Sequence, residues 1–335
     1  MSGRLLCVVG LGLIGGSLLR AAERAGWKAQ GAATSSADVG AARAAGFDVT
    51  SSVDEALRAA ADCDGLVALA VPLPAVADVL PVVARWAPRC LLTDVVSVKQ
   101  PVATAVAHHA PAARYVGGHP MAGTSRSGWT AGSADLFAGA PWVVSTDEGV
   151  DPDGWAQVAR LALDCGAQVV PATAADHDAA VARISHLPHV LAAVLAAVGA
   201  DGGPLAMALA AGSFTDGTRV AGTAPELVRA MCEGNHDALL TAVDDALGRL
   251  GAARGALAST GSLAATIRTG HLARRALDAA RSSDRESLGQ VDLSNAGALE
   301  RLREIGRAGG RVVALHGTRC QIRRCNRLRN TTAPG

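Results

Sequence analysis

A histidine and a serine stand where two buried strands are predicted to end. His119 lies in the glycine-rich stretch 117–123, where an imidazole can act as a general base near neutral pH. Ser97 lies in the stretch 93–99, at the end of another apolar run. Ligands of open α/β sheets bind beyond the carboxyl ends of the strands, so we expect both side chains to face one crevice. Lys99 is expected to face it too, and a helix cap is the alternative role for Ser97.

Further polar side chains that could bind a substrate lie in the later half of the chain. His186 and His189 are three residues apart and share one face of a helix whose first turn contains Pro188. No carboxylate at suitable spacing completes a metal site, so we expect no metal. We predict that both histidines contact substrate, with capping or packing as the alternative for His186. Arg219 precedes an apolar turn and offers a bidentate guanidinium to a carboxylate.

The N-terminal stretch 5–17 has the pattern of a dinucleotide-binding turn. An apolar run leads into the spacing G-x-G-x-x-G, and a helical pattern follows. Gly10 allows the tight turn, Gly12 lets the backbone approach a pyrophosphate, and Gly15 allows helix and strand to pack closely. An ordinary turn between strand and helix is the alternative. The expected cofactor-binding residues are Gly10, Gly12, Leu13, Ile14, Gly15, Thr34, Ser35, Ser36, Val71, Pro72 and Ser97.

The choice between NAD and NADP depends on residues 30–36. A fingerprint for NAD has an acidic residue after the second strand, where it binds the ribose 2′-hydroxyl. This segment has no acidic residue, and Asp38 lies beyond it. Its three hydroxyl residues, 34–36, could bind a 2′-phosphate, and nothing there would repel one. Both cofactors therefore remain open.

The first half of the chain predicts the elements that would position these residues. Strand and helix patterns alternate, and a continuous apolar run such as 65–71 is typical of a strand buried on both faces of a parallel sheet. We therefore expect an α/β, Rossmann-like, doubly wound parallel sheet over residues 1–172. Helical periodicity then predicts an all-α domain over 173–318, which we expect to bind substrate and to pair in a dimer. A disordered basic tail is expected over 319–335. The predicted strands are 5–9, 28–33, 47–50, 65–71, 91–96, 115–117, 142–145 and 168–170, and one further strand is predicted after the helices, at 311–315.

Composition excludes several classes of protein. The 335 residues suffice for two domains, and the net charge of +1, without a basic aromatic patch, argues against nucleic-acid binding. We expect no membrane segment, because no apolar run reaches about 18 residues. The N-terminus lacks the pattern of a secretory signal, and the 7 cysteines are scattered without metal-ligand pairing. These features predict a cytoplasmic protein with reduced core thiols.

Taken together, these segments resemble the prephenate and arogenate dehydrogenase family of tyrosine biosynthesis. The combination of His-Pro-Met-Ala-Gly with Ser-His-Leu-Pro-His is specific, whereas the glycine fingerprint alone is not. The resemblance implies oxidative decarboxylation of prephenate to 4-hydroxyphenylpyruvate, with arogenate to tyrosine as the alternative, and hydride transfer to NAD(P)+. It also implies a homodimer formed through the helical domain. The matching segments are residues 10–17, 70–72, 94–99, 117–123, 139–142, 185–189 and 215–221.

The resemblance also implies roles for individual residues. His119 would draw the proton from the C4 hydroxyl of the substrate, and Ser97 would hydrogen-bond the same hydroxyl. Arg219 would bind a substrate carboxylate, and His189 would line the pocket opposite. The β-hydroxyacid dehydrogenase group uses a lysine in its helical domain, and this chain has no lysine after Lys99. A protein that senses NAD(P) without catalysis is the remaining alternative.

Overall fold

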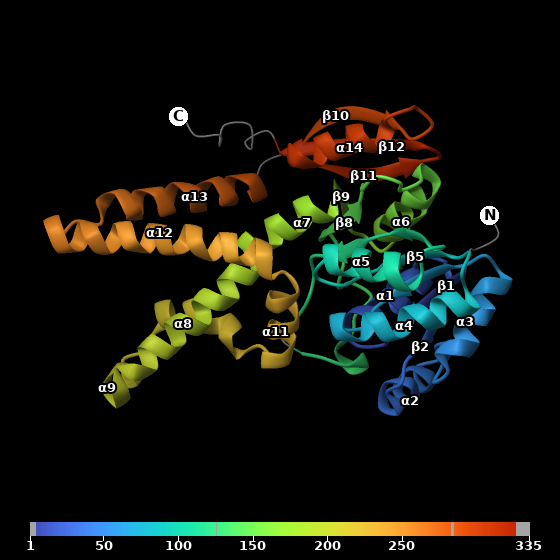
Figure 1. The fold of residues 1–335 in the computed structure, drawn as a ribbon, viewed down its shortest axis with the longest axis horizontal. Helices are drawn as coiled ribbons and strands as arrows, with labels where there is room; N and C mark the ends of the chain where they lie inside the picture. The colour runs from blue at the N-terminus through green and yellow to red at the C-terminus, as the bar shows by residue number, and fades with distance from the viewer. Residues whose placement is uncertain (1–4, 125, 283–284, 326–335) are drawn as a thin grey trace. The chain divides into compact units, whose positions relative to one another are not determined.

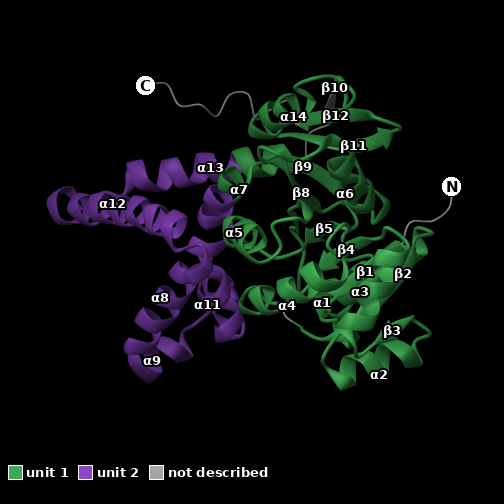
Figure 2. Ribbon diagram, turned by 45° about the vertical axis from the view of Figure 1, so that its right-hand side comes forward, with its two compact units in different colours: residues 1–177, 276–335 green, residues 178–275 purple. Residues whose placement is uncertain are grey.

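The computed structural model describes residues 5–124, 126–282 and 285–325, which form two compact units (Figures 1 and 2). The first unit contains the described residues up to His177 together with those from Ala276 onward. The second unit comprises Asp178–Arg275.

Six parallel strands form the first sheet of unit 1, in the order β3-β2-β1-β4-β5-β6. The chain runs outward from β1 to β3 and then returns to build the other half from β4. This creates a topological switch point beside β1, where ligands of such sheets bind. The strands are β1 (Leu5–Val9), β2 (Lys28–Ala32), β3 (Val49–Thr50), β4 (Leu66–Leu69), β5 (Leu91–Asp94) and β6 (Arg114–Val116). The connecting helices are α1 (Leu13–Arg24), α2 (Ser36–Ala44), α3 (Val53–Asp62), α4 (Leu73–Trp86) and α5 (Gln100–His109).

Alternate residues of β1 belong to two different cores, which explains its unbroken apolar sequence. Leu6 and Val8 belong to a core that includes buried residues of α1, α2 and α6 (Pro152–Asp164). Leu5, Cys7 and Val9 belong to a core with buried residues of α3, α4 and α5. Successive side chains of a strand point to opposite faces, so helices cover both faces of this sheet. The predicted doubly wound fold is confirmed.

A second, mixed sheet extends unit 1, in the order β10-β12-β11-β9-β8-β7. Strands β8 and β9 are parallel, and the other pairs are antiparallel. The predicted strands at 142–145 and 168–170 are present, but they belong to this sheet and do not continue the parallel one. The strands are β7 (Gly118–Pro120), β8 (Pro141–Ser145), β9 (Gln168–Ala172), β10 (Arg285–Asp292), β11 (Gly310–His316) and β12 (Arg319–Cys325). A 3-10 turn, η1 (Trp129–Ala131), lies between β7 and β8, and α14 (Ala298–Arg307) lies between β10 and β11.

The predictions of an all-α domain over 173–318 and of a disordered tail from residue 319 are both wrong for residues 285–325. Residues 285–325 form three strands and a helix that belong to unit 1. The physical reason is an apolar inner face, since Val312, Leu315, Cys320 and Ile322 are buried in the same core as Val169. The predicted strand at 311–315 is confirmed as β11, whereas the arginines of residues 319–325 hide the alternation of β12 in the sequence. Residues 326–335 of the expected tail lie outside the described residues.

Helices make up unit 2. The first of them, α7 (Ala174–Val181), begins in unit 1 and continues through the π-helical turn η2 (Ala182–His186) into α8 (Leu187–Asp201). The remaining elements are α9 (Gly203–Ala208), α10 (Gly212–Thr218), the 3-10 turn η3 (Arg219–Gly222), α11 (Pro225–Gly234), α12 (His236–Thr260) and α13 (Ala264–Ser282).

The helical segment Ala174–Asp201 is long and apolar enough to span a membrane, with 28 residues and a mean hydropathy of 1.6. This differs from the expectation of no membrane segment. The reason is that polar residues such as His177 and Arg183 interrupt the apolar runs but leave the average high. A helix that packs against other protein helices can have the same composition, so this test alone does not assign a membrane location.

The cysteines divide by position. Cys7, Cys90, Cys165 and Cys320 are buried, whereas Cys63 is exposed, so the expectation that all the thiols lie in the core is wrong for Cys63. Burial raises the pKa of Cys7 and of Cys165 to about 12, because the charged thiolate loses its hydration there.

Candidate active site

The glycine turn after β1 has the form that a bound diphosphate requires. Gly10 has φ +103°, and a Cβ there would overlap the carbonyl oxygen of Ala70. A Cβ at Gly15 would overlap the Gly10 carbonyl oxygen, whereas a Cβ at Gly12 would meet nothing within 4 Å. Gly12 precedes α1, whose first turn has no acidic residue and no side-chain cap. The N-terminus of α1 therefore fits an anion such as pyrophosphate.

Other predicted cofactor residues lie around the same edge of the sheet. Leu13 and Ile14 form the start of α1 and are half-buried. Val71 and Pro72 follow β4, and the backbone nitrogen of Val71 would lie 3.1 Å from a Cβ at Gly10. The turn after β4 therefore lies against the glycine turn.

The hydroxyl residues after β2 are exposed, as a cofactor-binding role requires. Thr34, Ser35 and Ser36 precede or begin α2. Ser35 caps this helix, because its Oγ accepts a hydrogen bond of 3.2 Å from the backbone N–H of Asp38. The Oδ1 atom of Asp38 accepts a hydrogen bond of 2.9 Å from the backbone N–H of Trp129. Asp38 is thus engaged with η1.

A buried carboxylate organises the carboxyl ends of β5 and β6. Asp94 is fully buried, and its oxygens accept hydrogen bonds from the Val96 N–H at 2.8 Å, the Tyr115 hydroxyl at 2.6 Å and the Gly118 N–H at 3.3 Å. It also forms an ion pair with Lys99, which is buried too. The Lys99 Nζ donates a second hydrogen bond, 2.6 Å long, to the Gly118 carbonyl. The prediction that Lys99 faces the crevice is therefore wrong, because its charge is compensated inside the protein.

This network brings the neighbourhoods of Ser97 and His119 together. Val96 and Gly118 directly precede these two residues, and both of their N–H groups bond to the Asp94 carboxylate. Ser97 is half-buried and is not the N-cap of α5, since Lys99 occupies that position without a side-chain capping bond. The alternative role of Ser97 as a helix cap is therefore wrong.

His119 lies on a strand of its own, whereas the sequence predicted only that it follows the strand at 115–117. It is the central residue of β7 and pairs with Val143 of β8. Its Nδ1 atom lies 2.7 Å from Nε2 of His177, which is 3% exposed. His177 could not be singled out from the sequence, because it lies between Asp176 and Asp178 near the expected domain boundary and there looks like part of a solvated helix start.

The predicted substrate residues of unit 2 have three different environments. His186 is buried, and its Nδ1 lies 3.1 Å from the Nδ2 of Asn235, so the structure favours its alternative role in packing. The Nδ1 of His189 is buried with no hydrogen-bond partner in the part of the chain that the structure describes. Arg219 begins η3 and is exposed. Their approach to His119 stays a prediction.

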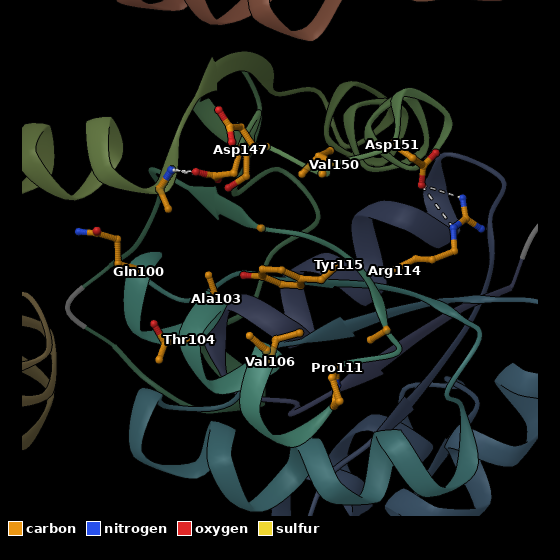
Figure 3. A pocket seen from close by; sticks show the side chains of 18 of the residues that line it. Gln100, Ala103, Thr104, Val106, Pro111, Arg114, Tyr115, Asp147, Val150 and Asp151 are labelled. Carbon is orange, nitrogen blue, oxygen red and sulfur yellow. Dashed lines mark hydrogen bonds and ion pairs between the residues drawn. The ribbon is translucent and has the colours of Figure 1, made fainter.

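A cavity of about 800 Å³ lies within unit 1, beside α5 and β6 (Figure 3). Tyr115 lines it and connects it to Asp94. At its rim, Arg114 forms an ion pair of 3.0 Å with Asp151. Burial alone would raise the pKa of Asp151, but hydrogen bonds from the Gly154 N–H and from Arg114 hold it below its usual value. Ser97 and His119 are not among the residues that line the cavity.

The arrangement suits the oxidation of an alcohol. The His119 imidazole lies on strand β7, and the half-buried hydroxyl of Ser97 follows strand β5. The glycine turn for a dinucleotide follows β1 of the same unit. A general base that takes a hydroxyl proton while hydride leaves the same carbon needs this combination.

Two family models match the chain. Residues 20–171 match the nucleotide-binding domain of prephenate dehydrogenase, and residues 173–262 match its dimerization domain. Residues 10–15, which form the glycine turn, precede the first matched range.

Individual solved structures and relatives are also similar to this chain. A crystal structure of a candidate prephenate dehydrogenase from Corynebacterium glutamicum is 42% identical, with a TM-score of 0.86, and covers 92% of this chain and 98% of that one. The arogenate dehydrogenase of Synechocystis is 30% identical, with a TM-score of 0.71, and covers 82% of this chain and 99% of that one. Prephenate dehydrogenase of Bacillus subtilis is 34% identical over 46% of this chain, and the match spans 43% of that curated relative's length.

Proposed function

This chain belongs to the prephenate dehydrogenase family, and we propose that it oxidises prephenate to 4-hydroxyphenylpyruvate with loss of CO2 and reduction of NAD+ or NADP+. The observation that carries the proposal is the shared anchoring of Ser97 and His119. The Asp94 carboxylate bonds to the residue before each of them, beyond the strands that form the nucleotide-binding edge. The location that we infer for this activity is the cytoplasm.

The reaction begins at the hydroxyl on C4 of the cyclohexadiene ring. His119 accepts the hydroxyl proton, and Ser97 hydrogen-bonds the same oxygen and holds it toward the imidazole. When bound, the nicotinamide cofactor supplies the acceptor for the hydride that leaves C4. The O–H electron pair then forms the C4 carbonyl. A positioned base of this kind contributes about 10²–10⁴-fold to the rate.

Decarboxylation completes the reaction. The bond between the ring and its carboxylate breaks, and its electron pair enters the ring, which becomes aromatic as CO2 leaves. The carbonyl oxygen becomes a phenol oxygen and takes back a proton from His119. Aromatisation makes the sequence effectively irreversible.

We propose that unit 2 supplies the groups that hold the substrate. Arg219 would bind a carboxylate with its paired N–H groups, and its exposure leaves it accessible to a ligand. His189 would hydrogen-bond the substrate, which would satisfy the buried Nδ1 that has no partner among the described residues.

Arogenate is the second candidate substrate. The observation that favours it is the similarity to the arogenate dehydrogenase of Synechocystis, at 30% identity over 99% of that chain. Arogenate has the same ring and hydroxyl and differs by an amino group in place of the side-chain keto group. The chemistry assigned to His119 and Ser97 therefore applies to either substrate.

We also propose that the chain forms a homodimer through unit 2. The exposed large apolar side chains of the described residues lie between Ile184 and Leu277, and the dimerization model matches residues 173–262. Apolar exposure on this scale marks an interaction surface. The helices of a second copy would then cover the apolar segment Ala174–Asp201 without a membrane.

A direct assay tests the proposed reaction. The purified protein is incubated with prephenate or arogenate and with NAD+ or NADP+, and reduced nicotinamide is followed by absorbance while the product is identified by mass spectrometry. We expect turnover with release of CO2. Absence of turnover with both substrates and both cofactors would refute the proposal.

A further inference from the structure

The Nδ1 of His119 lies 2.7 Å from the Nε2 of the buried His177, and this contact has a consequence for catalysis. We propose that His177 is a positioning residue that holds His119 in its proton-accepting form, and that α14 of the C-terminal segment fixes His177 in place. This rests on the proposed function, in which His119 is the base.

The two ring nitrogens in contact differ in the role that each can take. A hydrogen bond between two neutral imidazoles needs one donor and one acceptor. If His119 Nδ1 carries the proton and donates to His177 Nε2, then His119 Nε2 has a lone pair and can take the substrate proton. The opposite assignment puts a proton on His119 Nε2 and removes the base. His177 therefore acts through His119 and needs no contact with substrate.

The orientation of His177 is set by the start of α7. Both Asp147 carboxylate oxygens accept from the Ala174 N–H, at 3.0 and 3.1 Å, and Thr173 Oγ1 accepts from the Asp176 N–H at 3.0 Å. These bonds satisfy N–H groups that a helix start otherwise leaves unpaired. The first turn of α7, which carries His177, is therefore fixed to the end of β8.

Helix α14 contacts the same turn and the ends of the neighbouring strands β8 and β9. Arg307 forms an ion pair of 2.9 Å with Asp176, and Arg303 donates a hydrogen bond to the Thr146 carbonyl. Gly306 lies so close to β9 that a Cβ there would overlap the carbonyl oxygen of Pro171. The matched family models end at residue 262, so α14 lies beyond the part of the chain that they match.

The first test compares two variants of His177. His177→Leu removes the acceptor, whereas His177→Gln can present an amide oxygen in its place. We expect His177→Leu to lower kcat about 10- to 100-fold, the range known for hydrogen-bond partners that orient metal-binding histidines, while the KM for cofactor stays unchanged. His177→Gln should restore most of kcat at the same thermal stability. His316→Leu, at an exposed position, is the control. Equal losses in the Leu and Gln variants would overturn the proposal.

A spectroscopic readout separates this inference from the proposed function. In ¹⁵N-histidine-labelled protein without ligand, the His119 signals, assigned by their loss in His119→Asn, should show a proton on Nδ1. In His177→Leu the proton should move to Nε2. A wild-type His119 protonated on Nε2 would overturn the proposal whatever the activity. If turnover is absent while His119 still has its proton on Nδ1, the proposed function is refuted. The hydrogen bond between His119 and His177 is then still supported.

The second test concerns α14. Gly306→Ala must push α14 away from β9, so we expect kcat to fall and the His119 Nδ1 signal to change. Gly40→Ala is the matched control, because Gly40 is a glycine of α2 whose Cβ would meet nothing within 4 Å. If Gly306→Ala lowers only the thermal stability and leaves kcat and the His119 signal unchanged, α14 has no part in the site. Should this variant fail to fold, Arg307→Ala replaces it. We then expect Arg307→Ala to lower kcat and change the His119 Nδ1 signal, and Arg307→Lys to restore both.

Discussion

Asp94 and Lys99 form a buried ion pair, and through it the protein joins the end of β5 to β7. Asp94 accepts from the Gly118 N–H, and Lys99 donates to the Gly118 carbonyl at 2.6 Å. The pair therefore fixes both peptide groups that flank Gly118, the second of which joins Gly118 to His119.

We predict that Lys99→Met destabilises the protein by about 3–5 kcal/mol, because it leaves the Asp94 carboxylate buried without a counter-charge. Urea unfolding of the purified variant measures this. Lys28→Met is the control, since Lys28 is the other lysine of the chain and is exposed on β2. Similar unfolding free energies for the two variants would show that the pair has no special part in stability.

The sequence predicted the parallel sheet and the glycine turn because both depend on local patterns. An unbroken apolar strand and the G-x-G-x-x-G spacing can be read within a dozen residues. The roles of Lys99 and His177 could not be predicted, because they depend on partners 5 and 58 residues away. The apolar run at 311–315 predicted β11, but β12 was hidden for another reason, since arginines at 319, 323 and 324 mask the alternation of its buried residues Cys320 and Ile322.

The exposed hydroxyl residues after β2 predict weak discrimination between the two cofactors. We expect the kcat/KM values for NAD+ and NADP+ to differ by less than about 100-fold, or ~2.7 kcal/mol. Thr34→Asp should raise the KM for NADP+ by about tenfold or more, because a carboxylate there repels a 2′-phosphate. Thr34→Asn is the uncharged control. A wild-type preference for NAD+ above about 100-fold would contradict the prediction.

The apolar surface of α12 predicts a dimer that charge can break. Leu247 and Leu250 are 59% and 58% exposed. We expect the double substitution of both residues by arginine to convert a dimer into a monomer, measured by light scattering after size exclusion, because two charges would be buried without partners. Ala112→Arg adds charge at an exposed position of unit 1 and should have no effect. A wild-type protein that is monomeric at micromolar concentration would contradict the proposal.

The C-terminal segment contains a carboxylate whose ionisation favours the folded state. Hydrogen bonds from the hydroxyls of Thr318 and Ser294 lower the pKa of Asp292 from 3.8 to about 2. A lowered folded-state pKa contributes stability that is present above pH 4 and is lost as the pH falls toward 2. We predict that Asp292→Asn lowers the Tm at pH 7 and that the difference from wild type narrows at pH 2.5. A difference that does not change with pH would exclude this role.

His119→Asn tests the central claim most directly, with turnover and cofactor binding measured on the same preparation. Asparagine keeps a polar side chain of similar volume but cannot act as a base near neutral pH. We predict that kcat/KM falls about 10²–10⁴-fold, while the Kd for the nicotinamide cofactor, measured by fluorescence titration, stays within about twofold of wild type. Turnover equal to that of the wild type would show that His119 is not the base.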